Sequence, residues 1–150
     1  MGSIEEAIGK SRGGLTTKIH AVTDGNGNAM NFIITEGNVH DCKKAKDLLE
    51  PVIHKDAAVL GDRAFDTDEI IAYIALKMAI SAIPPKKNRV IQREYDKELY
   101  KNRNQIERFF NRLKNFRRIA TRYDKLVSSF MALVQLAAAL ICIPKFSPIV

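Results

Sequence analysis

The residues best suited to chemistry share one predicted helix. Tyr100, Arg103, Glu107 and Lys114 are separated by three, four and seven positions. At about 100° per residue, all four fall within one polar stripe. Glu107 then has two interpretations. It is either half of an ordinary i,i+4 ion pair with Arg103, or a ligand for a divalent cation, with the nearby cations placed for DNA phosphates.

A second candidate carboxylate follows a short apolar run. Asp62 comes directly after Ala57–Gly61, and the uniformly apolar pattern of this run predicts a strand buried on both faces. Hard cations prefer oxygen ligands held on rigid elements, and the end of a strand can supply one. Because an Asp at the end of a strand is more often a cap or turn residue, Asp62 alone does not show that a metal site is present.

The charge is concentrated in one part of the chain. The net charge is +7, and residues 86–125 hold 14 Lys/Arg against 5 Asp/Glu. Such a block is either a solvated helical face or a surface for a phosphate-rich partner, and its density favours the partner. The two cysteines have no CxxC spacing, which is typical of free thiols in a reducing compartment.

The remaining pattern predicts a mixed α/β chain. Asp24–Asn28 is a turn between two strands, Asp41 caps the next helix, and His20 is a structural strand residue. A hairpin followed by alternating units predicts a mixed sheet with helices on its faces, and residues 86–93 form a flexible loop. The last apolar segment is at the lower length limit for a membrane span, and we interpret it as a buried helix. The predicted strands are Leu15–Thr23, Ala29–Thr35, Ala57–Gly61 and Ala79–Ile83, and the predicted helices are Asp41–Leu49, Thr67–Met78, Glu94–Ile119 and Leu126–Ile143.

Several segments resemble one protein family. The spacing Tyr-x2-Arg-x3-Glu-x6-Lys from Tyr100 to Lys114 resembles the signature around the third catalytic acid of DDE transposases from bacterial insertion-sequence families four and five. Gly61–Asp66 resembles the family's AD(K/R)GYD segment, in which a buried strand ends in the second catalytic Asp. Arg12–His20 and Thr35–Asp41 resemble its hairpin and the turn that follows. The resemblance runs from about Gly9 to Ala139, in the expected order.

This resemblance implies a fold, an activity and a set of site residues. The fold would be RNase H-like, a mixed sheet flanked by helices, over residues 15–143 with tails at 1–14 and 144–150. The activity would be metal-dependent phosphoryl transfer, cleaving and joining DNA strands at insertion-sequence ends with Mg²⁺ or Mn²⁺. The implied catalytic and metal-binding residues are Asp62 and Glu107, and the implied DNA-binding residues are Tyr100, Arg103, Lys114, Arg12, Lys18 and Arg63.

The chain departs from the family pattern at its beginning. Relatives carry the first catalytic Asp on a central strand before the hairpin, and residues 1–10 contain no Asp. We therefore expect a fold that is incomplete at the N-terminus, with its first strand missing and its neighbours' edges unpaired. The chain would be the downstream frame of a frameshifted transposase, joined to an upstream fragment, or a remnant that binds DNA without catalysis and inhibits the full enzyme. Expected partners are DNA and either the upstream fragment or further copies of the chain, in the bacterial cytoplasm at the nucleoid and without a membrane.

Overall fold

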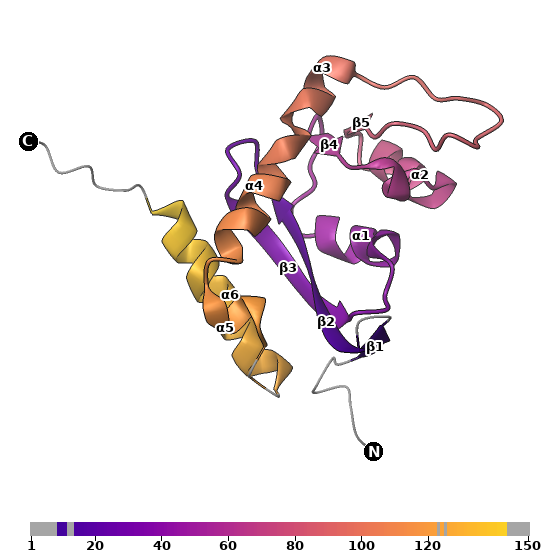
Figure 1. The fold of residues 1–150 in the computed structure, drawn as a ribbon. Coiled ribbons are helices and arrows are strands. Elements are labelled where there is room, and N and C mark those ends of the chain that lie inside the picture. Colours follow the sequence, from indigo (N-terminus) through magenta and orange to yellow (C-terminus); the bar gives the residue numbers. More distant parts are fainter. Residues whose placement is uncertain (1–8, 12–13, 123, 125, 144–150) are drawn as a thin grey trace, which may run out of the picture.

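The chain folds into two small sheets with helices around them (Figure 1). This computed structural model describes residues 9–11, 14–122, 124 and 126–143. Strands β1 (Gly9–Ser11), β2 (Gly14–Thr23) and β3 (Ala29–Glu36) form an antiparallel sheet in that order. Strands β4 (Ala58–Leu60) and β5 (Ile80–Ala82) form a separate parallel pair. The mixed α/β class is confirmed, whereas the single mixed sheet is observed as two sheets.

The predicted hairpin is β2 and β3, and its turn is built by one carboxylate. Asp24 Oδ1 accepts hydrogen bonds from the backbone N–H of Asn26 at 2.9 Å and of Asn28 at 2.8 Å. These bonds keep the pKa of Asp24 below its usual value, although burial acts to raise it. Gly27 takes the positive φ of +82° that the turn needs and that glycine adopts without strain. Asp24 is therefore a turn residue, as predicted.

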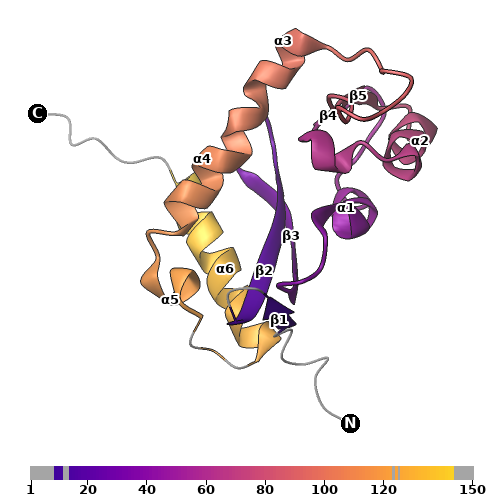
Figure 2. The same cartoon turned by 45° about the vertical axis from the view of Figure 1, so that its right-hand side comes forward.

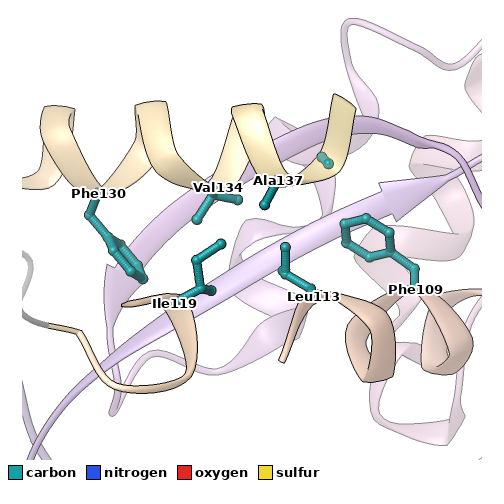
Figure 3. Close-up of a cluster of buried hydrophobic side chains, with 7 residues drawn as sticks. Phe109, Leu113, Ile119, Phe130, Val134 and Ala137 are labelled. Carbon is teal, nitrogen blue, oxygen red and sulfur yellow. The ribbon is translucent and has the colours of Figure 1, made fainter. Parts of the chain in front are cut away.

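One face of the hairpin is apolar and carries the main core. Ile19 lies opposite Ile34, and Ala21 opposite Phe32. Because side chains alternate along a strand, all four point to the same side, where helices α4 (Asn104–Leu113) and α6 (Val127–Cys142) cover them (Figure 2). The buried residues of this main core are Phe109, Leu113, Ile119, Phe130, Val134, Ala137 and Ala138, and Figure 3 shows α6 facing α4 and α5 (Arg117–Ala120) across it.

The other face of the hairpin meets α1 (Asp41–Leu49) through polar contacts. Asn31 Nδ2 donates to the Leu48 carbonyl at 2.9 Å, and His20 Nδ1 lies 3.0 Å from Asp41 Oδ1. The prediction that Asp41 caps α1 is wrong, because His40 occupies the cap position and Asp41 begins the first turn. Its carboxylate instead joins α1 to the hairpin.

A second, smaller core lies between α1, α2 (Asp68–Leu76) and the β4–β5 pair. Its buried residues are Ala45, Ile70, Ile74 and Ile83. Of the two residues that could cap α2 from the sequence, Thr67 and Asp68, Thr67 does so by accepting a hydrogen bond from the Ile70 N–H at 3.2 Å. The prediction that the β4 strand is buried on both faces is wrong, since its residues are exposed or half-buried. Among the described strands β4 pairs with β5 alone, so its second edge lacks the neighbour that would complete its burial.

The predicted long helix from Glu94 to Ile119 is observed in pieces. These are α3 (Lys97–Tyr100), a short 3₁₀ turn η2 (Lys101–Arg103), α4 and α5. Asp96 caps the first piece, accepting from the N–H groups of Glu98 and Leu99. Leu113 and Ile119 are both buried in the main core, yet on a continuous helix six residues would place them about 120° apart. The break after α4 lets both side chains reach α6.

The C-terminal apolar segment forms α6, as predicted. In the described part of the chain, no helix has the length and apolar character needed to cross a membrane. Four α6 residues, Phe130, Val134, Ala137 and Ala138, are buried in the main core. The segment therefore serves as a core helix.

Candidate active site

Asp62 stands at the start of a short 3₁₀ turn directly beyond β4. Its Oδ1 accepts the Ala64 N–H at 2.8 Å, which makes Asp62 the cap of η1 (Arg63–Phe65). The residue is exposed, and no hydrogen bond joins its Oδ2 to the described part of the chain. Capping thus fixes the side chain while leaving one oxygen free to bind a cation or a donor.

The polar stripe predicted from the sequence brings three of its four members together. Arg103 Nη2 lies 2.6 Å from Glu107 Oε1, and the Arg103 guanidinium lies 5.7 Å from the centre of the Tyr100 ring. Half of the Glu107 side chain is exposed. Lys114 is the C-cap of α4, exposed and seven residues further along. The ordinary ion pair is therefore present, and it holds Glu107 at the surface with Oε2 free of bonds to described residues.

An open hollow of ≈ 440 Å³ connects Asp62 to this helix. The residues that line it are Asp62, Arg63, Ala64, Pro84, Tyr95 and Tyr100. Tyr95 packs edge-on against Tyr100 with ring centres 5.5 Å apart. Glu107 does not line the hollow; it lies seven residues beyond Tyr100, or about 10 Å along a helix axis. The sequence did not single out Tyr95, because nothing in its neighbours indicates a site.

The predicted DNA-binding cations have different surroundings. Arg63 lines the hollow and is exposed. Lys18 donates to the Val39 carbonyl at 2.8 Å and lies 3.5 Å from Asp41, so its ammonium is engaged within the fold. Arg12 lies outside the described residues. Exposed cations with no ion pair to a described residue include Arg108, Lys114 and Arg117.

Two arginines of the predicted flexible loop are bound to a buried carboxylate. Asp66 is 1% exposed and accepts from Arg89 Nε at 2.8 Å, from Arg93 Nη1 at 2.5 Å and from the Lys86 N–H at 2.8 Å. Burial acts to raise the pKa of Asp66, but these donors outweigh it and the pKa is lowered. The basic residues of this loop are also plausible contacts for the DNA backbone from the sequence alone, but the structure engages Arg89 and Arg93 internally. Partners more than 20 residues apart leave no local sequence signal.

A buried polar cluster joins β2, β3 and α1. His20 Nδ1 lies 3.0 Å from Asp41, and its Nε2 lies 2.8 Å from Thr35 Oγ1. A carboxylate only accepts, so Nδ1 carries a proton, and the Thr35 hydroxyl donates to the Glu36 carbonyl at 3.1 Å. Burial lowers the pKa of His20, despite the opposing effect of Asp41. Only 3% of the His20 side chain is exposed, so it is structural, as predicted.

The described residues provide suitable donors for a hard cation but not a complete set. Asp62 and Glu107 are carboxylates, the donor type that Mg²⁺ and Mn²⁺ prefer. Within the described ranges, however, no three His, Cys, Asp or Glu side chains are grouped closely enough to hold a metal ion. The two carboxylates therefore fit such an ion in chemistry and still need further ligands.

Comparison with known proteins places the chain in a family. Residues 5–142 match the family model described as "Transposase DDE domain". A protein of Brucella ovis named "Putative transposase for insertion sequence element IS6501" is 41% identical over 128 residues, which cover 85% of this chain and 98% of that protein. No solved structure matches. A match over most of the chain, together with this relative, shows that the chain belongs to the DDE-domain transposases.

Proposed function

We propose that this chain carries two of the metal-binding carboxylates of an insertion-sequence transposase that cleaves and joins DNA. The observation that carries the proposal is the hollow lined both by Asp62, just beyond β4, and by Tyr100, the first residue of the Tyr-Arg-Glu-Lys stripe. Asp62 and Glu107 are proposed as ligands for Mg²⁺ or Mn²⁺. When bound, such ions stabilise charge on the attacking and leaving oxygens of a phosphodiester.

The third carboxylate is proposed to come from a partner. The described residues hold no three-ligand group, and the two sheets are not hydrogen-bonded to each other. An added strand between the two sheets, alongside β2 beyond the three residues that pair with β1, would unite them into the mixed sheet of an RNase H-like fold. An upstream fragment of the transposase is the proposed source, and association with further copies of the chain is the alternative.

The chain's own residues have distinct tasks in this proposal. Arg103 orients Glu107 through their ion pair and is itself stacked near Tyr100. Capping of η1 fixes Asp62. Arg63 in the hollow and the exposed Lys114 are proposed to hold phosphates, so that positioning and charge neutralisation precede chemistry.

An excision assay in cells tests this function. The gene is expressed with the DNA that precedes it, beside a reporter flanked by the ends of its element. We expect Asp62→Asn and Glu107→Gln each to abolish excision. Glu69→Gln is the matched control, because Glu69 is also an exposed helical carboxylate bound to one cation, with Lys46 at 2.7 Å. Wild-type excision by Glu107→Gln would overturn the assignment of Glu107.

A second candidate function is DNA binding without catalysis, as an occupant of the element's ends. It is favoured by the incomplete ligand set and by the exposed cations near α4 and α5. Binding to a duplex with the terminal sequence separates the two functions. Retention of DNA in chelator, with affinity falling steeply as salt rises, combined with no excision in cells, would establish this second function in place of the first.

A further inference from the structure

The connection from β5 to α3 begins and ends at the candidate active site. Pro84 lies near its start and Tyr95 near its end, and both line the hollow together with Asp62. Between them the chain runs out beyond α2 and returns, as the salmon-coloured loop of Figure 1 shows. A molecule bound in the hollow would therefore lie close to the tip of this loop.

The loop is held in one conformation at its base. The buried Asp66 binds Arg89, Arg93 and the Lys86 N–H, and Asp68 binds both arginines as well. Within the loop, Gln92 Nε2 donates to the carbonyls of Arg89 at 2.7 Å and Lys86 at 3.2 Å. These bonds fix the segment that was predicted to be flexible.

The fixed base presents two large apolar side chains to solvent. Val90 is 97% exposed and Ile91 is 80% exposed. Water is a poor environment for them, and the bonds at the base prevent the loop from folding back to bury them. A contiguous exposed aliphatic pair on a rigid support is a feature that indicates a binding surface.

The residues around the tip point to a polyanionic partner. Residues 84–93 contain no Asp or Glu. Lys86 and Lys87 precede the tip on one side, and neither forms an ion pair with the described part of the chain. Proteins that bend DNA combine such cations on the phosphates with aliphatic side chains wedged between base pairs. The cations at the loop and the apolar tip match the two parts of that surface.

We propose that Val90 and Ile91 form an apolar wedge that enters duplex DNA beside the cleaved strand and unstacks a base step. This inference rests on the proposed function, since DNA must occupy the hollow. Four residues separate Ile91 from Tyr95, and an extended chain spans at most about 3.5 Å per residue. The wedge therefore acts within about 14 Å of the hollow, or about four base-pair rises of DNA.

Fluorescence of 2-aminopurine tests the wedge. The full chain is added to duplexes with the terminal sequence of the element, in which 2-aminopurine replaces each base in turn within four pairs of the element's end. We expect a rise of at least threefold at one step, because unstacking relieves quenching. Val90→Ser/Ile91→Ser should abolish the rise, while anisotropy shows DNA affinity lowered by less than tenfold and an unchanged dependence on salt.

Two controls make the result specific. Leu76→Ser removes another exposed aliphatic side chain, 78% exposed at the end of α2, and should leave the signal intact. Asp66→Asn weakens the base of the loop and should lower the signal although Val90 and Ile91 remain. Circular dichroism confirms that each variant is folded.

The outcomes separate the wedge from the proposed function. Tight binding by the wild type with no rise at any step would overturn the wedge and leave the transposase function standing. A rise in fluorescence that persists in Val90→Ser/Ile91→Ser would also overturn the wedge and leave the transposase function standing. If this variant in addition changes its oligomeric state while unstacking is retained, the tip is a contact between proteins. Failure of the wild type to bind any duplex would overturn both.

Discussion

The two cores of the molecule differ in how much of their stability comes from apolar packing. The main core, between the hairpin and α4–α6, contains two fully buried phenylalanines and strands of eight and ten residues. The smaller core, around α1, α2 and the β4–β5 pair, has only aliphatic residues among its buried members and strands of three residues, and its one aromatic neighbour, Phe65, is partly buried. Its attachments are polar: Asp41 to His20 on one side and Asp66 to the β5–α3 loop on the other.

This difference matters because the candidate active site spans both parts. Asp62 and Arg63 belong to the smaller part. Glu107 lies on α4, which packs into the main core, and Tyr100 and Arg103 lie in the α3 and η2 segments that lead into α4. The relative placement of the two carboxylates thus depends on the weaker half. We expect the main core to control whether the chain folds, and the smaller core to control whether the site is assembled.

The largest effect is expected from the main core. Phe109→Ala removes a side chain with no exposed surface, which lies 5.9 Å from the Phe32 ring. It should lower the free energy of unfolding by about 3–5 kcal/mol, measured by urea unfolding with far-UV circular dichroism. Val90→Ala, at a residue 97% exposed, should stay within about 0.5 kcal/mol. A loss below about 1 kcal/mol for Phe109→Ala would contradict the ranking of the two cores.

A smaller and local effect is expected from the second core. Ile74→Ala, at a residue 0% exposed, should cost about 2–3 kcal/mol. Native-state hydrogen exchange should show lost protection in α1, α2 and β4, with β2 and β3 protected as before. Leu76→Ala is the matched exposed position on the same helix. Equal loss of protection in both halves would mean that the chain unfolds as one cooperative unit.

The ion pairs at the β5–α3 loop come next. Asp66→Asn should cost about 2 kcal/mol, less than breaking a fully buried pair, because Arg89 and Arg93 are 21% and 28% exposed. The lowered pKa of Asp66 means that its contribution is complete above the unfolded value of about 3.9 and is lost as the pH falls through the lower folded value. Urea midpoints from pH 5 to pH 2 should fall more steeply in the wild type than in Asp66→Asn. Parallel curves would contradict this role.

The connection from β3 to α1, at Gly37, provides a test of how tightly the backbone packs there. A Cβ on Gly37 would lie 1.9 Å from Thr16 Oγ1 and 3.1 Å from the Thr16 carbonyl oxygen. The side chain can turn away but the backbone cannot, so Gly37→Ala should cost about 1–2 kcal/mol. A Cβ on Gly25 meets nothing within 4 Å, and Gly25→Ala should be neutral. Equal thermal midpoints for the two variants would show that Gly37 is not tightly packed against Thr16.

The smallest effect is expected from His20. Its lowered pKa means that the folded state favours the neutral ring. Stability should therefore be complete above the unfolded value of about 6.5 and decline as the pH falls below it. Comparison of urea midpoints at pH 7.5 and 5.5 measures the decline, which should disappear in His20→Gln and persist in the exposed control His54→Gln. A midpoint independent of pH in the wild type would contradict the buried cluster.

Local patterns in the sequence were enough to predict the hairpin, its Asp24 turn, and helices α2 and α6. Each depends on contacts between near neighbours, such as the Thr67 cap or the alternation along β2. The shared stripe of Tyr100, Arg103 and Glu107 was predictable for the same reason, since a helix fixes those spacings. The roles of these residues and of Asp62 in catalysis stay predictions.

Only the tertiary structure decided how distant residues meet. Tyr95 and Pro84 line the same hollow as Asp62, and Arg89 and Arg93 bind Asp66. Asp41 contacts His20 and does not cap its helix. The predicted long helix is broken, so that Leu113 and Ile119 share one core. The sequence by itself determined the elements and the spacing within them, because helix and strand periodicity depends on residues a few positions apart. Which charges pair and which strand edges stay open depends on packing between segments far apart in the chain, and no local pattern contains that information.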